Sequence, residues 1–96
     1  MSVNTSVTPK HVVARSPEHI FNEIDGEVVL LGIETGNFYG FDNILSNIWK
    51  KMEEPVTVQA LVDQLLTEYE VASEQCEKDV LDVFNQMLAD GLITIQ

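Results

Sequence analysis

Apolar positions in the first half of the chain follow the period of β-strands. Residues 19–24 and residues 27–33 form two strand-like runs, and the Asp25-Gly26 dipeptide separates them. Asp-Gly between two such runs is the strongest short signal for a β-hairpin. A second turn, at residues 34–37, leads to a third run at residues 38–41. The pattern predicts a three-stranded antiparallel meander whose third strand lies at an edge of the sheet.

From Asp42 onward the apolar positions recur with the helical spacing of three and four residues. Asp42 is a suitable N-cap for a first helix, and Pro55 ends it because proline lacks the amide donor. Thr57 can cap a second helix and Ser73 a third, which ends at Gly91. A short extended tail follows. The apolar stripes of the first two helices consist of Ile44, Leu45, Ile48, Trp49 and Met52, and of Val58, Leu61, Val62, Leu65, Leu66 and Tyr69; the tail is Leu92–Ile95.

Three strands followed by three helices predict a small α+β domain. The chain has 96 residues and is 45% hydrophobic, which suffices for one modest core. Residues 1–11 begin with a stretch rich in Ser, Thr and Asn and are expected to form a flexible N-terminal arm, and residues 12–96 the domain. The helices and the hairpin also resemble a helix-turn-helix with a wing, so DNA binding has to be considered.

The charge of the chain argues against DNA binding. There are 16 Asp and Glu residues against 5 Lys and Arg, a net charge of -11. Nucleic-acid binding draws its affinity from cationic side chains, and the helix that would enter the groove carries one lysine, Lys78, among several carboxylates. The charge favours either solubility alone or basic partners. No apolar stretch reaches the length of a membrane span, so we expect no membrane partner and a cytoplasmic protein.

Candidate catalytic and metal-binding groups are few. Cys76 is the single cysteine, and neither His11 nor His19 lies in a metal-binding motif, so we expect no metal and no cofactor. Neither Ser46 nor Ser73 has a nearby histidine in the sequence. Acidic neighbours should raise the pKa of the Cys76 thiol, although the nearby helix N-terminus acts in the opposite direction. The sequence therefore predicts a protein that is not an enzyme.

The third helix has an apolar arc wider than one packed face requires. Two interpretations stay open for its margin: ordinary packing against the sheet, or the floor of a groove, where a methionine would adapt to variable partners. The residues expected to face the core are Leu81, Phe84 and Leu88, and the margin that we expect to be partly uncovered consists of Cys76, Val80, Val83 and Met87.

The predicted edge strand, residues 38–41, lacks the charges and prolines that usually protect an edge. Gly40 marks either a bulge or a place where another backbone approaches closely. Phe38, Tyr39 and Phe41 are either ordinary core and surface aromatic residues or part of a binding edge. If edge and helix margin adjoin, an extended peptide could add a strand to the sheet and place alternate side chains against the helix.

Several segments in order resemble the PqqD-like recognition elements of ribosomal peptide natural-product pathways. The resemblance covers about residues 12–95 and implies a winged-helix-like fold without DNA binding, in which the leader of a precursor peptide adds beside the third strand and lies against the third helix. The segments are Asp25-Gly26, residues 36–42, Ile48-Trp49, Thr57-Val58, Asp79-Val80 to Leu88, and Gly91-Leu92-Ile93. The implied peptide-binding residues are Asn37, Phe38, Tyr39, Gly40, Phe41, Cys76, Asp79, Val80, Val83 and Met87.

Within that family, the chain is most similar to the stand-alone proteins of lasso-peptide pathways. The resemblance implies that it presents the leader to a separate leader protease and performs no bond chemistry. The alternatives are a peptide chaperone for a radical SAM enzyme, as in pyrroloquinoline quinone pathways, and a generic protein-interaction domain that forms a homodimer. We expect a monomer or a weak homodimer.

Overall fold

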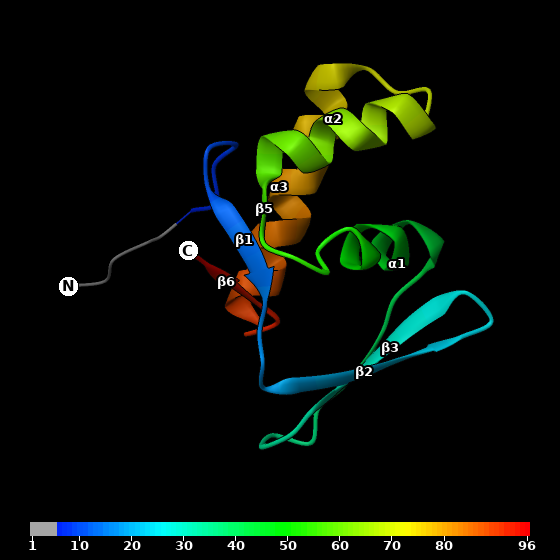
Figure 1. The fold of residues 1–96 in the computed structure, drawn as a ribbon, viewed down its shortest axis with the longest axis vertical. Helices are drawn as coiled ribbons and strands as arrows, with labels where there is room; N and C mark the ends of the chain where they lie inside the picture. The colour runs from blue at the N-terminus through cyan, green and yellow to red at the C-terminus, as the bar shows by residue number, and fades with distance from the viewer. Residues whose placement is uncertain (1–5) are drawn as a thin grey trace.

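The computed structural model describes residues 6–96, which fold into two small antiparallel sheets and three helices (Figure 1). In one sheet, β2 (His19–Ile24), β3 (Glu27–Gly32) and β4 (Phe38–Gly40) follow one another as a meander. This is the predicted three-stranded sheet, and β4 lies at its edge as expected. The helices are α1 (Asn43–Lys50), α2 (Val58–Glu68) and α3 (Ser73–Ala89), so the predicted α+β class is confirmed.

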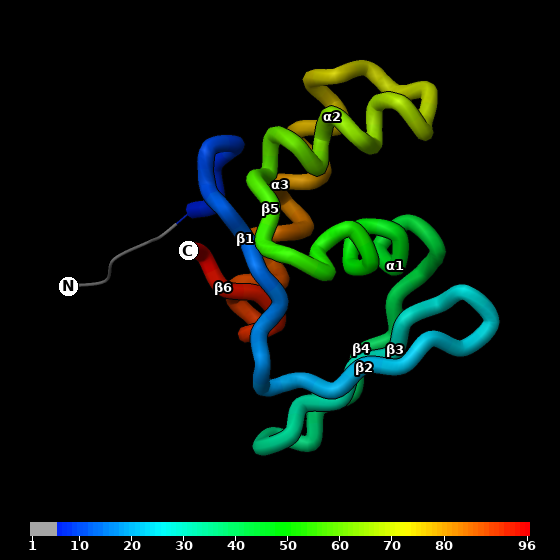
Figure 2. The backbone as a smooth tube through the Cα atoms, in the orientation of Figure 1, coloured from blue at the N-terminus to red at the C-terminus, as the bar shows by residue number. Residues whose placement is uncertain are grey.

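The second sheet joins segments that are far apart in the sequence. Its central strand is β1 (Val12–Arg15), which pairs with β5 (Val56–Thr57) on one side and β6 (Ile93–Ile95) on the other. The sequence pattern predicts β6 only as an extended tail and does not predict β1 or β5. Figure 2 traces the chain from β1 directly into β2, with α2 and the β2–β4 sheet at opposite ends of the molecule.

The predicted hairpin turn has the expected conformation. Asp25 and Gly26 have φ angles of 53° and 84°, both in the left-handed region, as a two-residue type I′ turn requires. Downstream, β3 and β4 keep one regular register through Gly40, which pairs with Val29. A bulge at Gly40 is therefore ruled out for this pair of strands.

The predicted N-cap residues are correct for two of the three helices. The Asp42 side chain accepts a hydrogen bond from the Leu45 amide at 2.8 Å, and the Thr57 side chain caps α2 in the same way. The prediction that Ser73 caps α3 is wrong: Ala72 occupies the N-cap position, and no side chain bonds there. The first helix also ends earlier than expected, at Lys50, and Met52 is buried just beyond it.

The core lies between the sheets and the helices, around Trp49. Its ring meets those of Phe21 and Phe41 edge-on, with centroids 6.0 and 5.8 Å away. The Arg15 guanidinium stacks over Trp49 and Phe21 and donates two hydrogen bonds to the Trp49 carbonyl oxygen. Desolvation by this packing lowers the pKa of the Arg15 guanidinium below its ordinary value. These contacts join the two sheets, because Arg15 belongs to β1 and Phe21 to β2.

The buried face of α3 is rotated from the predicted one. Phe84 is fully buried as expected, but Leu81 and Leu88 are only half-buried. Cys76, Val80 and Met87, which we expected to be partly uncovered, are 6%, 3% and 4% exposed. That expectation is wrong for these three residues, which belong to the buried core cluster; Val83 is half-buried.

The predicted N-terminal arm is partly outside the described residues, which begin at residue 6. Within the remainder, Val7 is buried and its amide donates to the Asn85 Oδ1 at 2.9 Å. A division of the chain into an arm of residues 1–11 and a domain of residues 12–96 stays a prediction.

Candidate functional site

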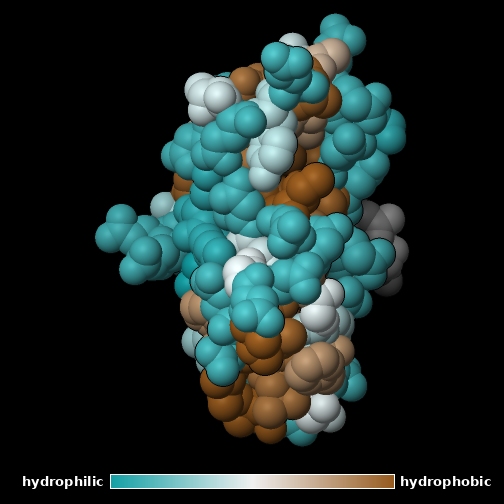
Figure 3. Space-filling model, turned by 90° about the vertical axis from the view of Figure 1, so that its right-hand side faces the viewer, coloured by the Kyte–Doolittle hydropathy of each residue, from teal (hydrophilic) through white to brown (hydrophobic). Residues whose placement is uncertain are grey.

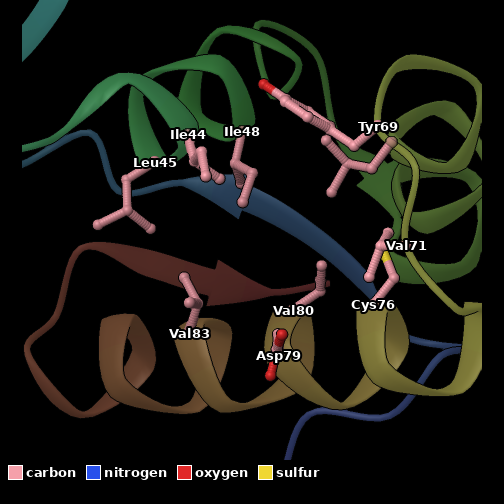
Figure 4. A pocket seen from close by; sticks show the side chains of 10 residues that line it. Ile44, Leu45, Ile48, Tyr69, Val71, Cys76, Asp79, Val80 and Val83 are labelled. Carbon is pink, nitrogen blue, oxygen red and sulfur yellow. The ribbon is translucent and has the colours of Figure 1, made fainter.

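An apolar hollow of about 220 Å³ opens between α1 and α3 (Figure 4). The side chains of Ile44, Leu45 and Ile48 approach it from α1, and those of Val80 and Val83 from the opposite wall, α3. The remaining lining residues are Leu65, Tyr69, Val71, Cys76 and Asp79. Cofactor pockets usually enclose ~300–1,000 Å³, so the size and apolar lining of this hollow suit individual side chains of a peptide better than a cofactor.

The α1 wall results from the start of that helix. Because Asp42 caps the helix, α1 begins three residues after β4 ends, and Ile44 and Leu45 lie in its first turn. Ile44 remains 54% exposed although it is apolar. The α1 wall therefore continues directly from the edge strand and offers uncovered apolar surface.

Polar contacts hold the end of α2 against α1 beside the hollow. The Asn47 side-chain amide donates to the Glu68 Oε1 at 2.8 Å and to the Tyr69 hydroxyl at 3.2 Å. Lys51 forms an ion pair with Glu68 at 2.5 Å. The hydrogen bonds from Lys51 and Asn47 lower the pKa of the Glu68 carboxyl from 4.5. These contacts place Tyr69, which is 40% exposed, at the hollow together with Val71.

The α3 wall is apolar except for Asp79, the one charged side chain among the ten described residues that line the hollow. Asp79 is exposed, and its carboxylate accepts a hydrogen bond from the Gln75 side chain at 2.8 Å. Burial, and then the charge of Asp79, raise the pKa of the Cys76 thiol above 9.0. A protonated, buried thiol is a poor nucleophile, so Cys76 contributes apolar surface here.

Within residues 6–96, the outer edge of β4 pairs with no other strand and has a defined set of outward-directed backbone groups. The Gly32 amide donates to the Asn37 carbonyl, and the Phe41 amide to the Val28 carbonyl, each at 2.9 Å. In an antiparallel pair the backbone groups of successive residues point alternately toward the partner and away from it. Asn37, Tyr39 and Phe41 therefore face β3, whereas Phe38 and Gly40 direct their N–H and C=O groups outward.

The structure brings together four of the residues predicted for the site. Cys76, Asp79, Val80 and Val83 all line the hollow. Met87 does not line it, because its side chain is buried in the core. Whether these residues bind a peptide stays a prediction.

The residues predicted on the third strand separate between two faces. Phe41 is 8% exposed and packs on Trp49, and Tyr39 is half-buried against the core. Phe38 is 69% exposed and lies on the other face of the sheet, opposite the core. Asn37 and Gly40 are exposed next to the free edge. No residue of β4 lines the hollow, so edge and hollow are connected through the start of α1.

The walls that α1 and the end of α2 supply are not predicted from the sequence. The apolar stripes of both helices are visible there but were not connected with a binding site, and Val71 gives no signal because it lies between helices. Ile44 and Leu45 are adjacent apolar residues at a helix start, which widen the apolar arc beyond one packed face; this was the available signal. The missed residues are Ile44, Leu45, Ile48, Leu65, Tyr69 and Val71.

Among the described residues, no group of three or more His, Cys, Asp or Glu side chains is arranged to hold a metal ion. Within residues 6–96, no helix combines the length and the apolar composition that a membrane span requires.

This chain is similar to one known protein family and to solved structures of other proteins. The family described as coenzyme PQQ synthesis protein D (PqqD) matches residues 27–93. The structure of TbiB1 in complex with the TbiA(beta) leader peptide superposes with a TM-score of 0.79 at 32% identity, covering 83% of this chain and 93% of that one. A lasso peptide synthetase B1 complexed with the leader peptide has the same fold, with a TM-score of 0.71, 18% identity, and coverage of 85% and 96%. No curated protein sequence matches significantly.

Proposed function

The chain belongs to the PqqD family, and from this membership we propose that it binds the leader segment of a ribosomally made precursor peptide. The observation that carries the proposal is an unpaired β4 edge beside an apolar hollow, in a chain 32% identical to a protein solved with a leader peptide. The leader adds as a strand to β4 and is held by the outward backbone groups of Phe38 and Gly40.

Side chains in the hollow supply most of the specificity. Each backbone hydrogen bond contributes only ~0.5–1.5 kcal/mol net, and ordering a free peptide consumes much of that. Apolar side chains of the leader enter the hollow between α1 and α3, where Ile44 and Val83 are incompletely covered. Asp79 stands among them as an acceptor for a cationic side chain or a peptide N–H.

The protein acts by delivery in lasso-peptide biosynthesis and performs no bond chemistry itself. It holds the leader and thereby raises the local concentration of the precursor at a separate processing enzyme, the leader protease. The raised pKa of Cys76 supports a non-catalytic role, because the thiol is the strongest nucleophile that the hollow contains.

The test is titration of the purified chain with the leader encoded beside its gene, followed by calorimetry or fluorescence anisotropy. We expect saturable binding, and at least a tenfold loss of affinity on Val83→Glu, because a carboxylate would enter an apolar hollow. The matched control is Gln86→Glu, which adds the same charge to α3 at an exposed position outside the hollow.

Three results bear on this proposal. Absence of binding at tens of micromolar by a correctly folded chain would refute it. Equal affinities of the Val83→Glu and Gln86→Glu variants would remove the hollow from the site and leave only the strand edge. Circular dichroism of both variants checks that the fold is retained.

A further inference from the structure

Three polar side chains join α1 to the end of α2, and we call Asn47, Lys51 and Glu68 the polar clasp. Asn47 lies on α1 and Lys51 at its C-cap, one helical turn apart, so both point to the same side of the helix. The Asn47 Nδ2 donates to the Glu68 Oε1 at 2.8 Å, and the Lys51 Nζ donates to the Oε2 at 2.5 Å. Because each partner binds a different oxygen, the Glu68 carboxylate is fixed in one orientation.

Asn47 connects the polar clasp to the hollow between α1 and α3. A carboxylate only accepts hydrogen bonds, so the amide nitrogen of Asn47, with its two hydrogens, faces Glu68. The same nitrogen donates to the Tyr69 hydroxyl at 3.2 Å, and the Tyr69 side chain lines the hollow. Figure 4 shows Tyr69 reaching from the end of α2 toward α1. The orientation of one asparagine therefore determines where the Tyr69 ring stands.

Burial does little to fix the connection between α2 and α3, residues 69–72. Tyr69 and Val71 line the hollow and yet are 40% and 39% exposed. The last turn of α2 contains no basic side chain, and α3 follows Ala72 without a side-chain cap. Figure 3 shows this side of the molecule, where hydrophobic residues lie among hydrophilic ones at the height of α1 and the end of α2. The polar clasp therefore does most to hold this wall of the hollow in place.

We propose that Asn47 is a positioning residue, which holds Tyr69 and Val71 as a wall of the hollow and so determines which apolar side chains the hollow accepts. That these side chains belong to a leader rests on the proposed function. A hollow of about 220 Å³ selects by shape only while its walls stay in place. The reason is that a gap of ~1 Å already removes up to about half of the dispersion attraction.

Two variants and a matched control test the role of the clasp. Asn47→Asp keeps the shape of the side chain, removes both donors, and places a second carboxylate beside that of Glu68. Tyr69→Phe keeps the ring and removes only the hydroxyl. The control is Gln59→Glu, which also turns an amide that donates to a carboxylate, Asp63 at 3.0 Å, into a second carboxylate. Gln59 is exposed near the start of α2 and does not line the hollow.

The first measurement is the affinity of each chain for an alanine scan of the leader encoded beside its gene. We expect Asn47→Asp to bind the native leader about tenfold more weakly than Gln59→Glu does. It should also lose selectivity at the leader positions that contact the Tyr69 wall, where alanine costs the variant less affinity than it costs the native chain. Tyr69→Phe should show the same change to a smaller degree. A merely destabilised fold would weaken all leaders by one common factor, so an unchanged alanine profile overturns the inference.

The second measurement needs no leader and uses Cys76, which lines the hollow together with Val71 and is 6% exposed. Iodoacetamide should alkylate Cys76 severalfold faster in Asn47→Asp than in Gln59→Glu, because a displaced wall opens the hollow. Added negative charge alone would slow the reaction, since it disfavours the thiolate. Equal rates in the two variants overturn the inference.

The two measurements separate this inference from the proposed function. A native chain that binds no leader refutes the proposed function. In that case faster alkylation of Asn47→Asp still supports the hold of the clasp on the wall, and equal rates still overturn it. Leader binding with an unchanged alanine profile leaves the proposed function standing and overturns the role of Asn47 alone.

Discussion

At the scale of single residues, the Ser46 hydroxyl has a structural role, because it forms buried hydrogen bonds with the backbone. It is 1% exposed, and its hydroxyl accepts a hydrogen bond from the Val28 amide at 2.8 Å and donates to the Phe41 carbonyl at 3.4 Å. Val28 belongs to β3, and Phe41 follows β4. The hydroxyl therefore ties α1 to the sheet whose edge is the candidate binding strand.

Replacement of Ser46 should destabilise the fold. Ser46→Ala leaves the buried Val28 amide without a partner, and an unpaired buried donor costs ~1–3 kcal/mol. Urea denaturation should show this loss in the free energy of unfolding. Ser73→Ala is the matched control, because the start of α3 carries no side-chain cap and the residue is exposed. A loss in the control as large as that in Ser46→Ala would contradict this account.

Cys76 should react slowly. Because burial and Asp79 raise the pKa of its thiol, the thiolate fraction at pH 8 is below that of an ordinary cysteine. We expect iodoacetamide to alkylate the folded chain at least ~10-fold more slowly than the urea-unfolded chain, and bound leader to slow it further by covering the hollow. Equal rates in the folded and unfolded chains would show that the thiol is open to solvent.

The same pKa shift couples stability to pH. The folded state holds the Cys76 proton more tightly than the unfolded state does. Its contribution to stability is therefore complete below the ordinary value of 9.0 and is lost as the pH rises beyond it.

At the scale of elements, the β4 edge allows a test that leaves the protein unchanged. A leader strand paired with the outward groups of Phe38 and Gly40 must itself alternate between residues that face β4 and residues that face away. N-methylation of single leader residues should therefore weaken binding with a period of two, by tenfold or more at the facing positions. Fluorescence anisotropy with a series of methylated leaders measures the pattern, and a flat profile would exclude strand addition.

Elements defined by local signals were predictable, and elements defined by distant pairing were not. Asp25-Gly26 specifies its own turn, and Asp42 and Thr57 cap helices through residues three positions away. In contrast, β1 has four residues and β5 two, and they are strands only because they pair with each other and with β6. Such short strands have no period of their own.

The candidate site was predictable only in part, because local periodicity marks its α3 residues but not the elements that pack around them. The apolar arc of α3 indicated Cys76, Val80 and Val83, but periodicity does not say which side of an arc is covered. That depends on which elements pack against α3, which is a property of the tertiary structure. Met87 lies at the same margin of the helix and is buried in the core. The ligand itself followed from family resemblance, because no composition or spacing specifies a leader peptide.

At the scale of the whole molecule, the β2–β4 sheet contributes to two different parts of the surface. Its free edge lies next to the start of α1 and the hollow. Its face opposite the core has the exposed side chains of Ile20, Leu31 and Phe38 side by side. The molecule is only 19 Å across its shortest axis, so an added strand is a large addition to its surface. The net charge of -11 is partly concentrated here: residues 17–41, which contain this sheet, have five acidic residues and no Lys or Arg.

The pairing of β1 with β6 determines how the molecule responds to mechanical force. Val13 lies opposite Ile95, and the Gln96 amide donates to the Val12 carbonyl at 2.8 Å, so the chain enters β1 and leaves β6 at the same end of the ribbon. Tension applied through the two termini would unzip this pair one hydrogen bond at a time instead of shearing all its bonds together. The β1–β6 pair is thus a weak mechanical element that yields under pulling before the load reaches β4.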